Sequence, residues 1–150
     1  MNVVSPRSPR ETPPDLAVGE VVAERVYALT RNDLIRYAGA SGDFNPIHWN
    51  QRIAASMGMP GVIGHGMLTM ALAGRLLTDW LGDPGAVIEY GVRFSKPVVV
   101  PDDDVGIKVH VKATITAVRD DGVREITLEA LVDDNKVLTR ARALVRGSSS

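Results

Sequence analysis

Residues 64–81 read GHGMLTMALAGRLLTDWL and include the most apolar run of the chain. From Met67 to Leu81 the apolar side chains recur all round a helix and leave almost no polar face. A helix of this kind in a soluble protein is expected to be buried. Its small residues, Ala71, Ala73 and Gly74, would let a sheet come close. The segment therefore predicts a buried helix at the centre of the fold.

The chain that follows this helix changes to a period of two from Ala86 onward. Alternation of apolar with polar or small residues is typical of strands with one buried face. It predicts strands over Val87–Phe94, Ile107–Ala117, Ile126–Val132 and Val137–Val145, with Pro97–Val100 as a continuation or an edge. Residues 120–122 (Asp-Asp-Gly) and 133–136 read as turns between antiparallel strands.

The chain that precedes the central helix supplies one more strand and two shorter helices. The strand is expected over Val21–Leu29, and Thr30 with Asp33 three positions later is typical of a helix start. That helix should bury Leu34, Ile35, Tyr37 and Ala38 and end near residues 41–42. Asn50 can cap a second, short helix that stops before Gly58 and Pro60.

One apolar helix and one curved antiparallel sheet bury each other if the sheet wraps the helix, which predicts an α+β fold. We expect a single domain over residues 15–146, a length that can bury a real core. Residues 1–14, with four prolines and no apolar block, are expected to be a disordered arm rather than a secretory signal. Residues 147–150 are expected to be a disordered tail.

The composition excludes several classes of function. The net charge of −1 gives no electrostatic footprint for nucleic acid, and no segment has the roughly 20 apolar residues of a membrane helix. The absence of cysteine excludes disulfides, thiolate metal sites and cysteine nucleophiles, and it fits a cytoplasmic location. Asp102, Asp103 and Asp104 are expected to form a solvated turn rather than a calcium site.

A second informative stretch, residues 42–48, reads Gly-Asp-Phe-Asn-Pro-Ile-His. Gly42 and the pair Asn45-Pro46 are turn formers, so Asp43 and His48 should lie on irregular backbone that can aim both side chains inward. A carboxylate and an imidazole without a cysteine or third ligand nearby indicate proton transfer rather than metal binding. The alternative is an ordinary loop with an Asx turn and a helix cap.

Residues 37–48, together with Gly64-His65-Gly66-Met67, resemble the signature of the MaoC-like, or hydratase 2, branch of the hot-dog superfamily. The resemblance covers about residues 16–146. Within that family, residues 66–70 and 82–87 look most like the catalytic subunits of mycobacterial (3R)-hydroxyacyl-ACP dehydratases. It implies a central helix wrapped by a five- to six-stranded sheet, a dimer formed edge to edge, and R-specific hydration or dehydration of acyl thioesters without a cofactor or metal.

The resemblance also implies roles for residues. Asp43 and His48 would hold a water between them, and the backbone N–H of Gly66 would stabilise the developing enolate oxygen. Asn45 would cap the turn or hydrogen-bond the water or the Asp43 carboxylate. His65 is expected to be a structural or substrate-positioning residue. Phe44 and Trp49 are expected in core or dimer packing rather than in an acyl tunnel.

Three questions of function stay open at this point. The substrate would be a thioester of CoA or of acyl carrier protein, received by a basic rim of Arg93, Lys96 and Arg75. The dimer partner would be a second copy or a related hot-dog subunit, in which case this chain would be the catalytic half and inactive alone. A hot-dog thioesterase is the alternative enzyme, although nothing acidic lies between Met67 and Thr78. The small residues at 71–74 replace a hydroxyl residue of some relatives and would leave room for a longer acyl chain.

Overall fold

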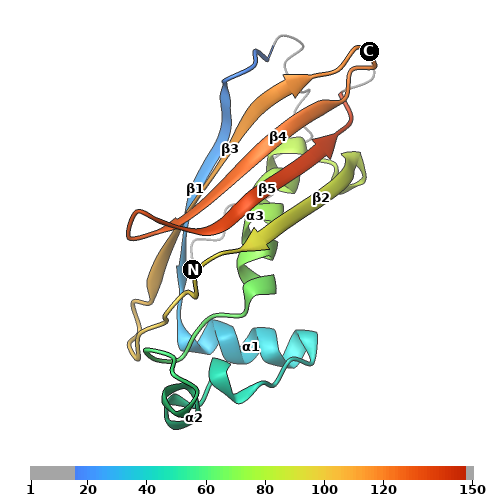
Figure 1. The fold of residues 1–150 in the computed structure, drawn as a ribbon. Helices are drawn as coiled ribbons and strands as arrows, with labels where there is room; N and C mark the ends of the chain where they lie inside the picture. The colour runs from blue at the N-terminus through green and yellow to red at the C-terminus, as the bar shows by residue number, and fades with distance from the viewer. Residues whose placement is uncertain (1–15, 148–150) are drawn as a thin grey trace.

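The computed structural model describes residues 16–147, so most of the expected arm and tail lie outside the described residues. Its five strands form one antiparallel sheet with the order β1-β3-β4-β5-β2. The elements are β1 (Val21–Leu29), α1 (Arg31–Ser41), η1 (Pro46–His48), α2 (Gln51–Ser56), α3 (Gly66–Leu81), η2 (Pro84–Ala86), β2 (Val87–Phe94), β3 (Ile107–Val118), β4 (Arg124–Val132) and β5 (Asn135–Val145). Figure 1 shows α3 lying along one face of the curved sheet, with α1 and α2 gathered beyond its amino end.

The long strands β3, β4 and β5 form the meander that the alternating pattern predicts. On β3 every second side chain from Val109 to Ile115 is fully buried, and on β4 the residues from Ile126 to Ala130 alternate in the same way. The last strand begins two residues earlier than expected, because Asp133 and Asp134 make a tight two-residue turn with φ of 46° and 62°. Asp tolerates this left-handed conformation better than most residues do.

The helix α1 begins as the sequence indicates. The Thr30 side chain accepts a hydrogen bond from the Asp33 backbone N–H, and the Asp33 carboxylate accepts one from the Thr30 N–H. Leu34 and Ala38 are buried, but Ile35 is 53% exposed, so its predicted burial is wrong within this chain. Successive side chains on a helix point about 100° apart, so α1 packs Leu34 against the core and turns its neighbour Ile35 toward solvent.

The central helix α3 is buried on one side only. Thr69, Ala73, Leu76, Leu77 and Leu81 face the sheet and are buried, whereas Met67 is 55% exposed. The expectation of a helix buried all round is therefore wrong for the single chain. An apolar surface left uncovered on a central helix is typical of an interface with another chain.

The segment expected as a strand over Pro97–Val100 makes only an isolated bridge, between Ile63 and Val99. The Gly64 N–H donates to the Val98 carbonyl over 2.8 Å, and the Val100 N–H donates to the Val62 carbonyl over 2.9 Å. These bonds hold the approach to α3 against residues 98–100. They set the position of the amino end of α3, where the candidate site lies.

No helix within residues 16–147 is long and apolar enough to cross a membrane.

Candidate active site

The loop between α1 and η1 carries Asp43 and is closed by its own polar groups. Gly42 ends α1 with a left-handed φ of 76°, a conformation that favours glycine. Asp43 Oδ1 accepts from the Asn45 N–H over 3.2 Å, and Asn45 Oδ1 accepts from the Ile47 N–H over 3.3 Å. Pro46 takes the first position of η1, where its missing N–H costs nothing. The loop is therefore built to present Asp43 and His48 from two fixed backbone positions.

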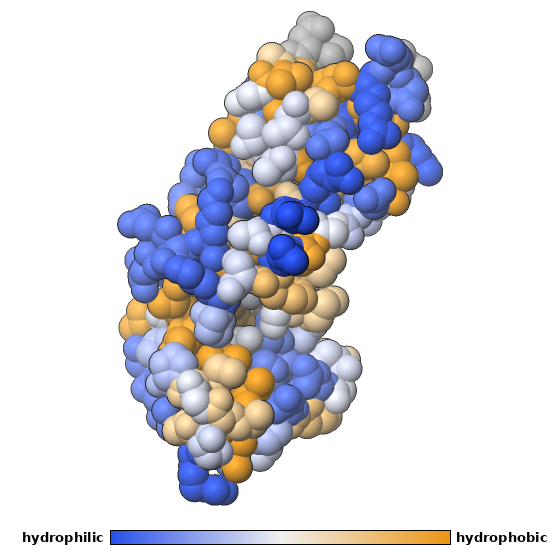
Figure 2. All heavy atoms as spheres, in the orientation of Figure 1, coloured by the Kyte–Doolittle hydropathy of each residue, from blue (hydrophilic) through white to orange (hydrophobic). Residues whose placement is uncertain are grey.

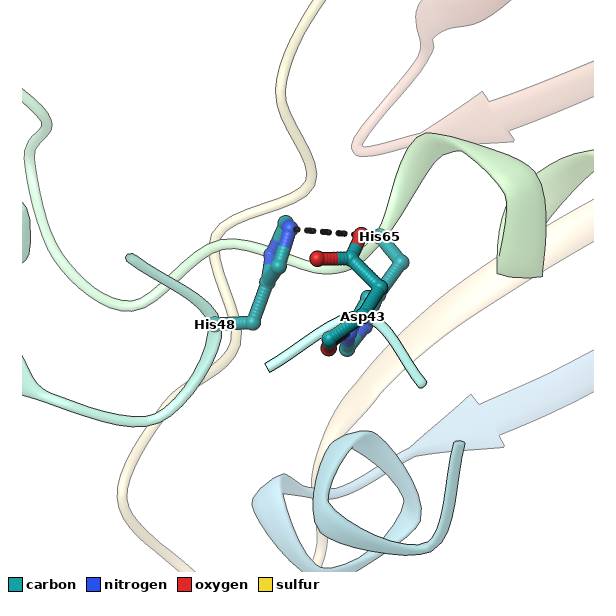
Figure 3. A group of neighbouring side chains, drawn as sticks. All are labelled: Asp43, His48 and His65. Atoms are coloured by element: carbon teal, nitrogen blue, oxygen red, sulfur yellow. Dashed lines mark hydrogen bonds and ion pairs between the residues drawn. The ribbon is translucent and has the colours of Figure 1, made fainter. Parts of the chain in front are cut away.

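Asp43 and His48 face each other across the opening of this loop (Figure 3). The distance from Asp43 Oδ2 to His48 Nε2 is 3.8 Å, too long for a direct hydrogen bond. The Asp43 side chain is 51% exposed and the His48 side chain 9%, so solvent reaches the pair from the carboxylate side. One water placed about 2.8 Å from each atom would contact both, since such spacings leave room for a bridging water.

His48 is held in one tautomer by the backbone. Its Nδ1 lies 2.7 Å from the carbonyl oxygen of Ile63, and a carbonyl only accepts, so Nδ1 carries the proton. The neutral ring then presents an unprotonated Nε2 toward Asp43. Ile63 is fixed in turn, because its N–H donates to the carbonyl of Ile47, the residue before His48. This arrangement leaves the imidazole free to accept a proton on the side of the carboxylate.

His65 lies beneath the pair as a buried imidazole. Its ring stacks on His48 with centroids 3.8 Å apart, and the Tyr37 ring meets it in an edge-type contact with centroids 4.8 Å apart. His65 Nε2–H donates to the Asp43 carbonyl over 3.1 Å, while within residues 16–147 its buried Nδ1 has no hydrogen-bond partner. Burial lowers the pKa of His65, because the charged ring would lose its hydration. The geometry therefore supports a positioning role for His65.

The lowered pKa of His65 makes stability depend on pH. A histidine whose folded pKa lies below its unfolded value binds fewer protons when folded, so stability falls as pH drops below the unfolded value of about 6.5. The loss is about 1.4 kcal/mol for each unit by which folding lowers the pKa. We expect urea unfolding from about pH 7 to about pH 5 to show this loss, and His65→Gln, which keeps a donor for the Asp43 carbonyl, to flatten the dependence. An unchanged slope in the variant would contradict the assignment.

A cavity of about 280 Å³ opens beside His48. Its lining includes His48 and Ile63 on one side, Gly66 and Thr69 of α3, and Phe94 and Leu138 of the sheet. In Figure 2 the outline is indented between the upper, sheet-bearing part and the lower, helical part, and apolar atoms border the indentation. The cavity therefore combines an apolar wall with the imidazole of the candidate pair, as a site for a small apolar substrate requires.

The amino end of α3 points its free backbone donors at this region. His65 caps the helix without a side-chain hydrogen bond, and within the described residues no acceptor meets the N–H groups of Gly66 and Met67. Free N–H groups at a helix amino end favour negative charge. A Cβ at Gly66 would lie 3.1 Å from the ring of Phe94, so glycine here keeps the approach to the N–H open.

Thr69 is a residue that the sequence reading missed. It is buried and lines the cavity. The signal was available in the spacing, since Thr69 lies three positions after Gly66 and so on the same face of α3. The polar side chain that α3 contributes to the cavity is thus that of Thr69, whereas residues 71–74 have no polar side chain.

The room expected beside residues 71–74 is not empty. The ring of Tyr90, from β2, lies over Gly74, where an added Cβ would be 3.1 Å from Tyr90 Cε1. At Gly74 the expectation of free space is wrong, because an aromatic side chain of the sheet fills the gap that glycine leaves.

Other predicted residues divide between the site and the surface. Asn45 acts as the cap of η1. Phe44 and Trp49 are exposed, so a place in the core of this chain is excluded for them, and neither lines the cavity. Of the basic residues proposed for the rim, Lys96 lines the cavity, whereas Arg75 and Arg93 do not. Asp102 to Asp104 are exposed, and Asp103 Oδ1 accepts from the N–H groups of Val105 and Gly106, as in a solvated turn.

Asp43, His48 and His65 also bring one possible metal-ligand atom each to within 4.8 Å of one another. Ligands of a tetrahedral zinc ion at about 2.0–2.1 Å must converge on one point. The two imidazoles instead stack with an angle of 22° between their planes, and each uses one nitrogen on a backbone carbonyl. The arrangement fits an acid–base pair better than a metal site.

Comparison with known proteins gives a consistent result. A protein-family model described as a MaoC like domain matches residues 15–133. A 3-hydroxyacyl-thioester dehydratase X of Mycobacterium tuberculosis is 41% identical over 76 residues, which is 51% of this chain and 26% of that protein. The chain spans only 26% to 64% of the length of the first three curated relatives that it matches.

Solved structures resemble the chain over most of its length. One described as a MaoC-like dehydratase has a TM-score of 0.85 and 38% identity over 89% of this chain and 41% of that one. An (R)-hydratase from A. caviae involved in PHA biosynthesis has a TM-score of 0.77 and 27% identity, covering 89% of this chain and 98% of that one. These likenesses confirm the expected α+β, hot-dog fold.

Proposed function

Because the chain belongs to the MaoC-like dehydratase family, we propose that it interconverts (3R)-hydroxyacyl thioesters and trans-2-enoyl thioesters by removing or adding water. The observation that carries the proposal is the facing pair of Asp43 Oδ2 and His48 Nε2, 3.8 Å apart beside an apolar cavity. The (R)-hydratase of similar fold supports the same chemistry.

The pair can prepare a water for addition. Because Nδ1 of His48 carries the proton that it donates to the Ile63 carbonyl, Nε2 is an acceptor, as is the Asp43 carboxylate. A water between them would donate one O–H to each, which turns its lone pairs outward to the substrate. In hydration the water oxygen bonds to C3, one member of the pair takes the water proton, and that proton is delivered to C2. The pair then returns to its starting state, and dehydration is the reverse.

The amino end of α3 would stabilise the charge that develops on the thioester oxygen. As water adds to C3, electron density moves onto the carbonyl oxygen until C2 is protonated. The N–H of Gly66 is suited to donate to this oxygen, because it has no acceptor within the described residues and Gly66 borders the cavity. Removal of one such donor elsewhere costs about 10²–10³-fold in rate.

The deciding experiment follows hydration of crotonyl-CoA and of a longer trans-2-enoyl-CoA by the purified chain, as loss of enoyl absorbance. Asp43→Asn, which keeps the shape of the side chain, is run beside it. Turnover that the variant loses would support the proposal. A folded chain inactive on CoA and carrier-protein esters, alone and with a related subunit, would overturn it. Release of free thiol would instead establish a thioesterase.

We also propose that the chain works as a dimer, either with a second copy or with a related hot-dog subunit. β2 is an edge of the sheet, and its Ile88 is 48% exposed. Unpaired strand edges with apolar side chains associate with other strands.

For a dimer with a second copy, light scattering should give twice the mass of one chain, and Ile88→Lys should halve it. Val118→Lys is the matched control, because Val118 has the same exposure on another strand. A monomeric wild type that stays monomeric in the presence of a related subunit would contradict the dimer.

A further inference from the structure

His65 contacts both members of the candidate pair, although it does not line the cavity. Its Nε2–H donates to the backbone carbonyl of Asp43 over 3.1 Å, and its ring stacks on the His48 ring with 22° between the two planes. The three side chains lie together in Figure 3. His65 is 1% exposed and is not among the residues that line the cavity, so a substrate in the cavity would not reach it. Any influence of His65 on the reaction must therefore pass through Asp43 and His48.

The imidazole of His65 fills its place at a cost in stability. Because Nε2 carries the proton that it donates to Asp43, Nδ1 is an acceptor, and this buried atom has no hydrogen-bond partner within residues 16–147. An unpaired buried acceptor destabilises a folded protein, whereas an apolar ring of similar shape has no such atom. A phenyl ring could stack on His48 but could not donate to Asp43. The imidazole makes both contacts from one side chain.

We propose that His65 is a positioning residue of the proposed reaction, which holds the backbone of Asp43 and the plane of the His48 ring at the same time. It thereby keeps Asp43 Oδ2 and His48 Nε2 opposite each other at the spacing that a bridging water needs. The inference rests on the proposed function, because it takes these two atoms as the acid–base pair. His65 itself neither gives nor takes a proton during turnover.

The His65 ring is well placed to hold the pair, because its own backbone is fixed. His65 caps α3, and its carbonyl accepts hydrogen bonds from the N–H groups of Leu68 and Thr69 over 3.1 and 3.3 Å. The ring of Tyr37, in the last turns of α1, packs against it in an edge-type contact. The ring therefore links the start of the central helix to the loop that carries Asp43 and His48.

His65 has to stay neutral for this role. The groups that face its ring are the Asp43 carboxylate and carbonyl, the His48 imidazole and the ring of Tyr37. A second proton, on Nδ1, would have no acceptor within the described residues and would place a positive charge against the ring that must accept a proton. Burial lowers the pKa of His65, although the hydrogen bond to the Asp43 backbone and the Asp43 charge act in the opposite direction.

Two variants of His65 each keep one of its contacts. His65→Phe keeps a ring on His48 and removes the donor to Asp43, whereas His65→Gln keeps a donor and removes the ring. Each should lower kcat for crotonyl-CoA hydration by about 10- to 100-fold per folded molecule with little change in KM, because a displacement of about 1 Å can cost about 10²-fold. Leu81→Ala is the control, since Leu81 is buried at the other end of α3 and does not line the cavity. It should lose stability and keep its kcat.

Nitrogen-15 NMR of the imidazole rings gives a readout that needs no turnover. The chain has three histidines, and His110→Asn identifies one of the three ring signals. At pH 8 the wild type should show His48 protonated on Nδ1 and His65 protonated on Nε2. At pH 6 His65 should still be neutral, although a solvated histidine, with a pKa of about 6.5, is then mostly charged. His65→Phe should keep the His48 tautomer, and His65→Gln should change it to a mixture of both tautomers.

The outcomes separate this inference from the proposed function. Full kcat in both folded variants, or a wild-type His65 that is charged at pH 6, would overturn the role of His65 and leave the reaction intact. An unchanged His48 tautomer in His65→Gln would show that the stack does not hold that ring. A wild type that turns over no enoyl thioester would overturn the proposed function, while the His48 tautomers would still decide whether His65 supports the ring. If one variant does not fold, the kcat and the His48 tautomer of the other decide the proposal.

Discussion

His48→Asn should lower kcat/KM for enoyl-thioester hydration by about 10²–10⁴-fold, the usual contribution of one acid–base group. Asparagine is the informative replacement, because its amide nitrogen can take the place of Nδ1 and keep the bond to the Ile63 carbonyl. What it removes is Nε2, the atom that faces Asp43. The variant should therefore fold and bind substrate as the wild type does, so that its kcat falls and its KM does not rise.

The double variant with Asp43→Asn gives a sharper test of the pair. If both groups act on one water, the second substitution removes an interaction that the first has already broken. The double variant should then be about as slow as the slower single variant, because residues that act as a unit are not additive. Losses that multiply would show that Asp43 and His48 serve separate steps. His110→Asn is the control, since His110 lies on the surface paired with Glu24 and should leave the rate unchanged.

The elements that the sequence predicts correctly are those with local signals. The bounds of β1 and the Thr30 cap follow from residues that contact their own neighbours in the chain. The start of α3 is one residue earlier than predicted, at Gly66 rather than Met67, because His65 supplies the cap without a typical capping side chain. Alternation predicts β3 and β4 well, since each buries one face in a single sheet.

The predictions that fail concern which elements of the fold pack against each other. The apolar side chains all round α3 indicate that the helix is buried, but not whether its second face packs against this chain or another. Glycine at position 74 indicates a close approach, but not that Tyr90, sixteen residues away, makes it. These contacts are set by the docking of β2 beside α3, for which the local pattern carries no signal.

The candidate site shows the same division. The spacing of Asp43 and His48 in a loop of turn formers is enough to nominate them. The tautomer of His48 depends on the carbonyl of Ile63, and the stacked His65 comes from a segment held by Val98 and Val100. Such long-range backbone contacts appear only once the fold is assembled.

Gly106→Ala should destabilise the fold by about 3–5 kcal/mol, a large loss for one methyl group. Gly106 has a φ of 76°, and a Cβ there would collide with the carbonyl oxygen of Leu29 and reach 3.0 Å from the Thr30 nitrogen. Neither neighbour can withdraw easily. Leu29 is buried and paired with Ile107 in the β1–β3 ladder, and Thr30 caps α1 through its own backbone. The collision would therefore strain the junction from which the helix before Asp43 begins.

Gly122→Ala separates this collision from the cost of the backbone conformation. Gly122 has nearly the same φ, 80°, but nothing lies within 4 Å of an added Cβ. Its free energy of unfolding should fall only by the cost of placing a side chain in the left-handed region, about 1–2 kcal/mol. Urea unfolding of both variants, compared at an unchanged m-value, measures the difference. Equal losses would show that the β1–α1 junction yields to the methyl group, and that the placement of α1 is softer than its buried contacts indicate.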